Sequence, residues 1–221
     1  YLVVLLGLTA CIDGGSGTGS GSESGTDGTY FPTVPENAVC DAFNDGNSLP
    51  TRGLVGDLVY LNDDQPRYTT ADQYIEFGQP ANVSVILNQL FIPTRPWDFG
   101  CTTNEGHTVL NQNGDPLYEY FGMRLNSRVK LKATDEPGYY QFAILSDDGS
   151  VLRSNEEIVI NNDGTHATKM GCTDQVVYMD AETTFPIEVT YYQGPRFHIS
   201  LVLLWKRYDS PDDVVLDPHC G

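Results

Sequence analysis

The distribution of apolar and polar residues along the 221-residue chain predicts β-strands rather than helices. No long stretch repeats its apolar residues every 3.6 positions, whereas several segments alternate with a period of two. In Ser127–Ala133, Val129 and Leu131 fall on one face, and Lys130 and Lys132 fall on the other. Alternation or a short apolar run predicts further strands at 57–61, 82–90, 138–145, 156–160, 186–192 and 197–205.

The last of these strands is apolar on both faces, because Val202 and Leu204 oppose Ile199, Leu201 and Leu203. A strand of this kind is expected in the middle of a sheet, covered on both sides. Turn residues separate the predicted strands at 62–66, 112–116, 135–138, 146–150 and 161–165. Many short strands joined by Gly, Asn and Asp turns predict an all-β fold, an antiparallel β-sandwich.

The charge balance restricts the possible partners of the chain. There are 12 Lys and Arg against 30 Asp and Glu, a formal net charge of −18. Such a chain repels phosphate backbones, so nucleic-acid binding is excluded. The acidic excess is compatible with binding of cations or of neutral ligands such as sugars. Hydrophobic residues make up 40% of the chain, which is enough for a sizeable core.

The first residues are typical of an exported protein. The apolar run Tyr1–Ala10 is shorter than the about 20 residues that span a bilayer, and it is interpreted as part of a secretory signal. The sequence LTAC at 8–11 resembles the lipobox of bacterial lipoproteins, which implies lipidation of Cys11 and a membrane partner. The alternative is a small-residue cleavage site followed by an unrelated cysteine. Ile12 rather than Asp after Cys11 favours the outer membrane, so the expected location is the surface of a bacterial cell envelope.

Three segments follow from composition. Residues 1–11 are the partial signal, residues 12–34 are a Gly- and Ser-rich flexible tether, and residues 35–221 are the folded domain. The spacings of Cys40, Cys101, Cys172 and Cys220 match no zinc or redox motif. In an exported domain they predict two disulfides. Three pairings are possible, and the one expected joins the domain ends through Cys40–Cys220, with Cys101–Cys172 inside.

The sharpest local feature is the tripeptide Asp147-Asp148-Gly149, directly after a predicted strand. Adjacent carboxylates repel each other unless a cation lies between them. Calcium takes six to eight oxygen ligands and accepts such pairs. The same tripeptide is also common in solvated turns, so spacing alone leaves both interpretations open.

An ordered series of motifs runs through residues 117–206: GYYQF at 138–142, LSDDGS at 145–150, VINNDGTH at 159–166, FPI at 185–187, YYQG at 191–194 and LVLLW at 201–205. The series resembles the protective-antigen domain (the PA-fourteen β-sandwich), which occurs in the anthrax toxin component, in many glycosidases and in yeast flocculins and related adhesins. Residues 40–101 more loosely resemble the flocculin type, which has an N-terminal extension and a cysteine near each end. That version suits a Cys40–Cys220 bridge.

The resemblance implies a metal site. In lectin members of this family two adjacent aspartates, joined by a cis peptide bond, chelate one calcium ion, which implies this role for Asp147 and Asp148. An amide side chain and two main-chain carbonyls from a neighbouring loop complete the protein ligands. Carried over, these are the amide oxygen of Gln193 and the carbonyls of Pro195 and Phe197.

The resemblance also implies a sugar site on that calcium. Vicinal hydroxyls of a sugar would complete the metal shell, with Asp147, Asp148 and Gln193 binding the ligand and Arg196 and His198 contacting its rim. Flocculin-type members have Asn at the position of Gln193, and some have a Trp that this loop lacks, so the sugar remains open.

One aromatic residue outside these motifs is a candidate for a second sugar contact. Trp97, in the segment 93–100, is either a platform on which a sugar stacks or a side chain that anchors its loop to the core. The core role is the one expected.

Taken together, the sequence predicts a surface lipoprotein whose calcium-dependent domain binds a glycan or a cell-surface polysaccharide. The alternative is a structural or protein-interaction module of the cell envelope without lectin activity. No enzyme activity is expected, because in glycosidases this domain is an accessory insert and no catalytic domain accompanies it here.

Overall fold

The computed structural model describes residues 53–87, 89–97 and 108–215. The partial signal, the tether and four of the five cysteines (Cys11, Cys40, Cys101 and Cys220) lie outside these ranges, so the predictions made for them stay predictions. Within the described ranges, no helix is long and apolar enough to cross a membrane.

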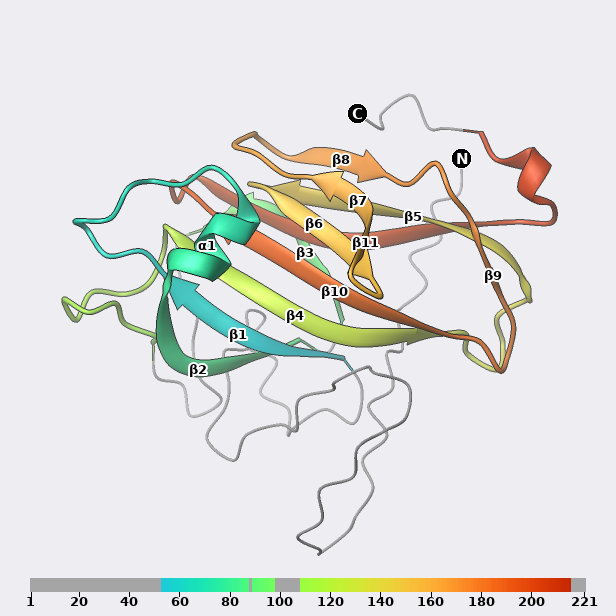
Figure 1. Ribbon diagram of the computed structural model, residues 1–221, viewed down its shortest axis with the longest axis horizontal. Helices are drawn as coiled ribbons and strands as arrows, with labels where there is room; N and C mark the ends of the chain where they lie inside the picture. Colours follow the sequence, from blue (N-terminus) through green and yellow to red (C-terminus); the bar gives the residue numbers. More distant parts are fainter. Residues whose placement is uncertain (1–52, 88, 98–107, 216–221) are drawn as a thin grey trace, which may run out of the picture.

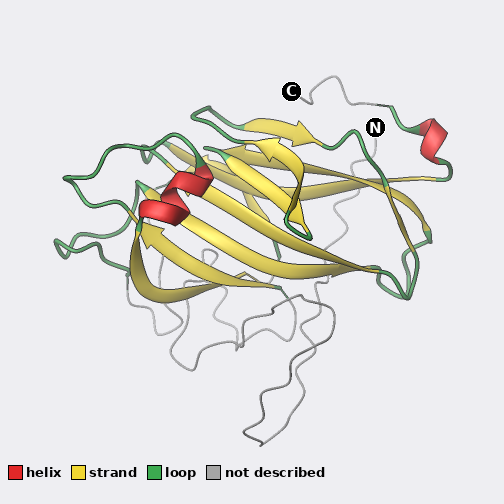
Figure 2. Ribbon diagram, in the orientation of Figure 1, coloured by secondary structure: helices red, strands yellow, loops and turns green. Residues whose placement is uncertain are grey.

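Two antiparallel sheets pack face to face and make up most of the described chain (Figures 1 and 2). The larger sheet has the order β2 (Gln79–Leu87), β1 (Leu54–Tyr60), β4 (Phe121–Lys130), β10 (Thr184–Gln193), β6 (Ser150–Ser154), β7 (Glu157–Asn162). The smaller has the order β3 (Phe91–Pro96), β11 (His198–Tyr208), β5 (Gly138–Asp147), β8 (Lys169–Cys172), and β9 (Val177–Met179) also pairs with β5. The predicted antiparallel β-sandwich is confirmed.

The core lies between the sheets and follows the predicted alternation. Ile187 and Val189 on β10 are buried in it, as are Leu201 and Leu203 on β11. β11 pairs with β3 on one side and β5 on the other, which confirms that the strand with two apolar faces is central. The sequence pattern therefore predicted both the direction of these side chains and the position of the strand.

Trp97 belongs to this core. It is 1% exposed and lies 6.4 Å from Phe121 between ring centroids. Its indole is therefore inaccessible to a sugar, which rules out the platform and confirms that the side chain anchors its loop.

One α-helix was not predicted. α1 (Ala71–Phe77) is only seven residues long, too short for a recognisable 3.6-residue repeat. Its first turn is capped by Thr70, whose side chain accepts a hydrogen bond from the Gln73 backbone. A short 3-10 helix, η1 (Pro211–Asp213), follows β11. α1 packs on β4 and β10 at the end of the sandwich that carries the Asp pair (Figure 1).

Candidate functional site

The Asp pair lies at the junction of the two sheets. Asp147 is the last residue of β5, and Asp148 begins the short connection to β6 in the other sheet. The peptide bond between them is cis, as the family resemblance implies. Both side chains are buried, with exposed fractions of 9% and 5%. Two carboxylates therefore occupy a protected position rather than a solvated turn.

Three loops meet at these carboxylates. Asp148 accepts backbone hydrogen bonds from His166, between β7 and β8, at 3.2 Å and from Gly194, after β10, at 2.8 Å. Asp147 accepts a hydrogen bond from the Thr168 hydroxyl at 3.3 Å. The pair thus joins the β5–β6, β7–β8 and β10–β11 connections, which lie far apart in the sequence.

Burial raises the pKa of Asp148 above its ordinary value. The Gly194 and His166 backbone N–H groups act in the opposite direction, and the neighbouring charge of Asp147 raises the pKa further. The charged form of Asp148 is therefore less favourable here than that of an ordinary aspartate. A bound cation would relieve this cost directly.

The Gln193 amide lies at the other side of the junction and is fully buried. Its Oε1 accepts a hydrogen bond from the Tyr191 hydroxyl at 2.6 Å. Its Nε2 donates to the carbonyls of Pro195 at 3.0 Å and His198 at 2.9 Å. The amide nitrogen, not the oxygen, thus faces the loop carbonyls of Pro195 and His198. That the Gln193 oxygen and the carbonyls of Pro195 and Phe197 bind a metal stays a prediction.

The Tyr191 hydroxyl can accommodate the Gln193 amide in two orientations, with either its oxygen or its nitrogen toward the loop carbonyls. It lies 2.6 Å from the main-chain oxygen of Asp147 and 2.6 Å from Oε1 of Gln193, but it carries only one proton to donate. A half-turn of the amide would let Nε2 donate to the Tyr191 oxygen, while Tyr191 donates to Asp147. Oε1 would then face the carbonyls of Pro195 and His198, and three oxygens that converge in this way require a cation.

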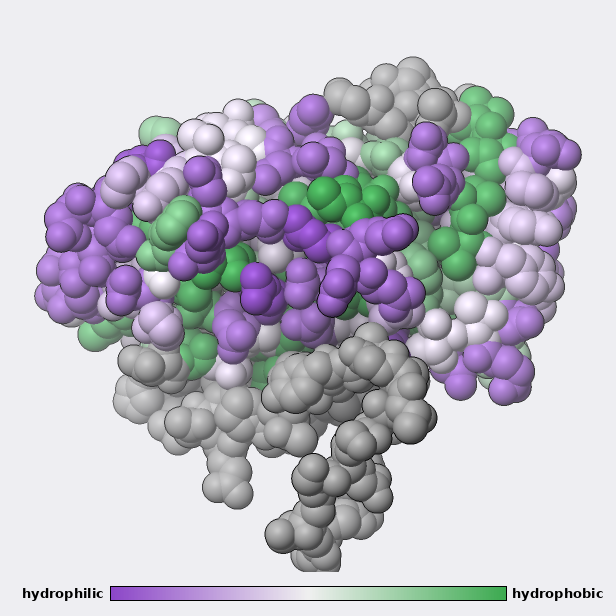
Figure 3. Space-filling view, in the orientation of Figure 1, coloured by the Kyte–Doolittle hydropathy of each residue, from purple (hydrophilic) through white to green (hydrophobic). Residues whose placement is uncertain are grey.

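The predicted rim residues are at the surface beside this junction. The side chains of Arg196, Phe197 and His198 are exposed, and Phe197 is 77% exposed. The Arg196 guanidinium lies 5.2 Å from the centroid of the Tyr118 ring. Most of the surface around α1 is hydrophilic (Figure 3). Arg196 and His198 are thus accessible, as contact with a ligand would require.

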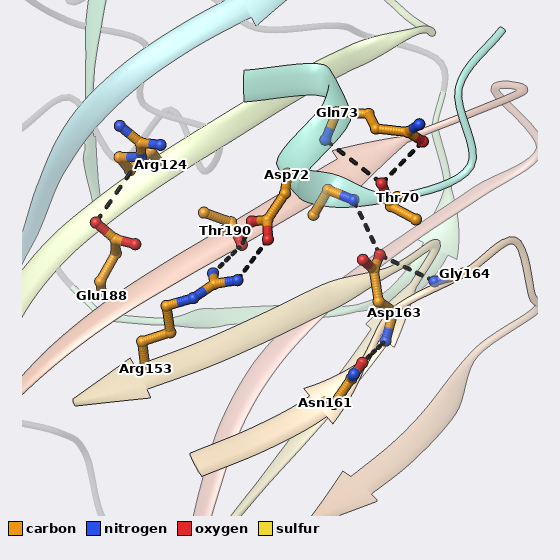
Figure 4. Close-up of polar contacts among 11 residues, drawn as sticks. Thr70, Asp72, Gln73, Arg124, Arg153, Asn161, Asp163, Gly164, Glu188 and Thr190 are labelled. Carbon is orange, nitrogen blue, oxygen red and sulfur yellow. Dashed lines mark hydrogen bonds and ion pairs between the residues drawn. The ribbon is translucent and has the colours of Figure 1, made fainter. Parts of the chain in front are cut away.

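α1 and the β7–β8 loop support the site from behind. Asp163 accepts hydrogen bonds from the backbones of Ala71, at the start of α1, and Gly164, both at 2.9 Å (Figure 4). Arg153 on β6 pairs with Asp72 and donates to Thr190 on β10 at 3.1 Å. These contacts fix the helix to the sheet next to the loop that bears His166.

Two stacked tyrosines complete this support. The rings of Tyr74, on α1, and Tyr192, on β10, stack with centroids 4.6 Å apart. The Tyr192 hydroxyl lies 2.9 Å from the Thr165 hydroxyl. Burial raises the pKa of Tyr192 to about 12, so its hydroxyl stays protonated at neutral pH.

The predicted metal ligands at the junction are all oxygens. In the described part of the chain, no group of three or more His, Cys, Asp and Glu side chains could hold a metal. A cation here would therefore depend on two carboxylates together with neutral oxygens, from Gln193 and from the carbonyls of Pro195 and His198. This mixture suits calcium, which accepts carbonyl and amide oxygens, better than zinc, which prefers nitrogen and sulfur ligands.

Several participants could not be found from the sequence. The predicted strand at 186–192 assigns no role to the Tyr191 hydroxyl, and the backbone donors of His166 and Gly194 have no side-chain signature. Only their distance in space from Asp148 and Gln193 assigns them. The sequence signal for Asp147, Asp148 and Gln193 came from the motif series, not from spacing.

Residues 113–217 match the sequence model of the PA14 domain family, which is the protective-antigen domain. Among curated proteins, none matches the chain. The matched segment contains the Asp pair and the whole β10–β11 loop.

Solved structures are similar at low identity. One is a PA14 sugar-binding domain from an RTX adhesin: 16% identity, 70% of this chain and 89% of that chain, TM-score 0.44. Another is the Epithelial Adhesin 6 A domain from Candida glabrata in complex with Galb1-3GlcNAc: 18% identity, 72% and 81%, TM-score 0.47. A third is a β-glucosidase from Kluyveromyces marxianus in complex with glucose: 16% identity, 80% and 18%, TM-score 0.43. The chain thus spans less than a fifth of that enzyme.

Proposed function

Residues 113–217 belong to the PA14 domain family, and from this premise we propose that the chain is a carbohydrate-binding module that holds its sugar through a calcium ion. The observation that supports the proposal most is that the β10–β11 loop contacts the buried Asp pair. Gly194, next to Gln193, donates its N–H to the Asp148 carboxylate, and the Tyr191 hydroxyl contacts both the Asp147 main-chain oxygen and the Gln193 amide. These groups come from the end of β5 with its connection to β6 and from the end of β10 with the loop to β11, the two segments that the resemblance implies.

Each residue has a role in this proposal. Asp147 and Asp148 supply the negative charge, and Gln193 supplies a neutral oxygen once its amide has turned. The Pro195 and His198 carbonyls lie beside that oxygen, and the bound calcium would supply an electrophile for vicinal sugar hydroxyls. Tyr191 orients Gln193 by accepting or donating its hydroxyl hydrogen bond. Arg196 lies at the rim, where it can contact the sugar.

The same proposal includes the setting of the module. The lipobox-like Cys11 and the flexible tether at 12–34 support display of the domain on a bacterial envelope, with the membrane reached through a lipid. A sugar site carried on a flexible tether is suited to adhesion or to recognition of a surface polysaccharide. Neither role requires a catalytic residue.

Calcium dependence of the melting temperature tests the metal part. At calcium 100-fold above its Kd, a single site stabilises the fold by about 2.7 kcal/mol, which corresponds to a rise in Tm of about 5–10 °C for a domain of this size. Asp147→Asn and Asp148→Asn should each abolish the rise. The exposed Asp212→Asn, which removes the same charge outside the site, should retain it. A wild-type Tm that calcium leaves unchanged contradicts the proposal.

One observation favours a second candidate, a structural or protein-interaction module. Both oxygens of Asp148 already accept backbone hydrogen bonds, from His166 and Gly194, so the carboxylate ties two loops together without a metal. In that case Asp148→Asn would destabilise the domain equally with and without calcium. The calcium-free Tm of this variant therefore distinguishes the two candidates.

A further inference from the structure

The outer side of the smaller sheet is unusually apolar for a surface. Strand pairing places Val202 opposite Leu145 and Phe91, on the side turned away from the core residues Leu201 and Ile144. Val202 is only 3% exposed on this side. Residues that share the outer side include Phe91, Leu145, Met170 and Leu204, all half-buried. A sheet face of this composition is normally covered by another part of the chain.

Cys172 lies on the same side, because it is paired with Ala143, which in turn pairs with Leu204. It is disulfide-bonded. It is also the single cysteine within the described ranges, so its partner belongs to the chain outside them. Some segment of that chain is therefore tied covalently to this face.

The chain after β11 returns to this face. The Tyr208 hydroxyl, near the end of β11, bonds the carbonyl of Val215 at 3.3 Å and Oε1 of Gln141 at 3.0 Å. Nε2 of Gln141 donates to the carbonyl of Thr173 at 2.7 Å. The Tyr208 hydroxyl shares its one proton between the Val215 and Gln141 acceptors, so contacts through Tyr208 and Gln141 connect Val215, the last described residue, to Thr173, the neighbour of Cys172.

Reach along the chain separates two of the candidate partners. Cys220 follows Val215 by five residues, which span up to about 17 Å, and Val215 is separated from Thr173 only by the side chains of Tyr208 and Gln141. Cys101 follows Pro96 by five residues, but Pro96 is paired with His198 at the opposite edge of the sheet. Cys172 on β8 is three strands away from Pro96 across the sheet, and it is six residues further along the strand direction, because it lies level with Leu204 of β11. The straight-line distance is about 25 Å. Even a fully extended segment with a disulfide of ordinary length barely covers that distance.

We propose that Cys172 pairs with Cys220 and that residues 216–221 cover the outer face of the smaller sheet. The pairing differs from the one expected from the ends of the domain. Formation of the bond joins the two Sγ atoms and releases two protons and two electrons, which a thiol–disulfide oxidant of the exported compartment accepts.

Peptide mapping of the full chain under non-reducing conditions tests the pairing. After proteolysis with free thiols blocked, mass spectrometry should find the peptide that contains Cys172 linked to the peptide that contains Cys220. The linked species should disappear on reduction. A link from Cys172 to Cys40, which is thirteen residues before Gly53 and therefore has a long reach, or to Cys101, would overturn the proposal.

A pair of variants provides an independent readout. Cys220→Ser should lower the Tm by about 10 °C, because it opens a loop of 48 residues, and should leave Cys172 reactive toward a thiol reagent. Cys40→Ser should leave Cys172 unreactive. Reactive Cys172 in Cys40→Ser, with an unreactive Cys172 in Cys220→Ser, would contradict the pairing even if both variants fold.

Discussion

Removal of a single hydroxyl group, by Tyr191→Phe, should weaken both the fold and the proposed calcium site. In the structure this hydroxyl is the shared partner of the Asp147 carbonyl and the Gln193 amide oxygen, both at 2.6 Å and both in buried residues. A buried acceptor left without a donor costs about 1–3 kcal/mol. Since one proton supports one full hydrogen bond, the loss should be about 2 kcal/mol, or a fall in Tm of about 4–8 °C.

Tyr192→Phe is the matched control, because it removes the same group from the next residue of the same strand. Its hydroxyl partner is Thr165, whose side chain is exposed, so water can replace the lost bond. We expect a cost of about 1 kcal/mol or less and no change in calcium affinity. Thermal unfolding of both variants, with and without calcium, measures the two effects separately.

Gln193 should be coupled energetically to Tyr191. In a double-mutant cycle with Gln193→Leu, the effect of Tyr191→Phe on calcium affinity should shrink, since the amide that the hydroxyl orients is already gone. Equal stability and equal calcium affinity of wild type and Tyr191→Phe would refute the role assigned to this hydroxyl. So would strict additivity in the cycle.

Three further outcomes are expected. Asp148→Asn should raise the Tm of the calcium-free protein at neutral pH, because burial raises the pKa of this carboxyl and makes its ionised form costly. A lower Tm would instead favour a structural role, in which the carboxylate holds the His166 and Gly194 loops together. Gly56→Ala should cost more than about 3 kcal/mol of stability or prevent folding, because its Cβ would lie 1.7 Å from the Arg124 carbonyl oxygen. Gly114→Ala has open space around it and should cost about 1 kcal/mol. Equal unfolding midpoints of the two variants in urea would contradict this. Tyr192 should ionise near pH 12 rather than near pH 10. The stability that its protonated hydroxyl contributes is therefore intact below pH 10 and is lost as the pH rises towards 12. A phenolate absorbance titration in which every tyrosine ionises near pH 10 would contradict this.

The strands could be predicted where one face is apolar and the other polar. β10 shows the alternation plainly, the pattern at 127–133 located only the last part of β4, and the two apolar faces of β11 indicated its central place. The short strands β6, β8 and β9 carry too few residues for a period to be recognised. α1 is likewise too short, and its stability comes from contacts with β4 and β10 rather than from its own pattern.

The site was predictable in its residues but not in its connections. The motif series identified Asp147, Asp148 and Gln193, and the structure brings them to one junction. The orientation of the Gln193 amide depends on Tyr191 and on the carbonyls of Pro195 and His198. Those contacts arise only when the β10–β11 loop folds over the end of β5, so no local pattern encodes them.

The central claim, a sugar held through calcium, is tested most directly by a glycan array. The full chain should be applied once with millimolar calcium and once with a chelator, alongside Asp148→Asn as the variant without the site. The account predicts binding to one or more glycans in calcium, lost with the chelator and absent in the variant. Binding that persists in the chelator, or no binding in either condition, would contradict it.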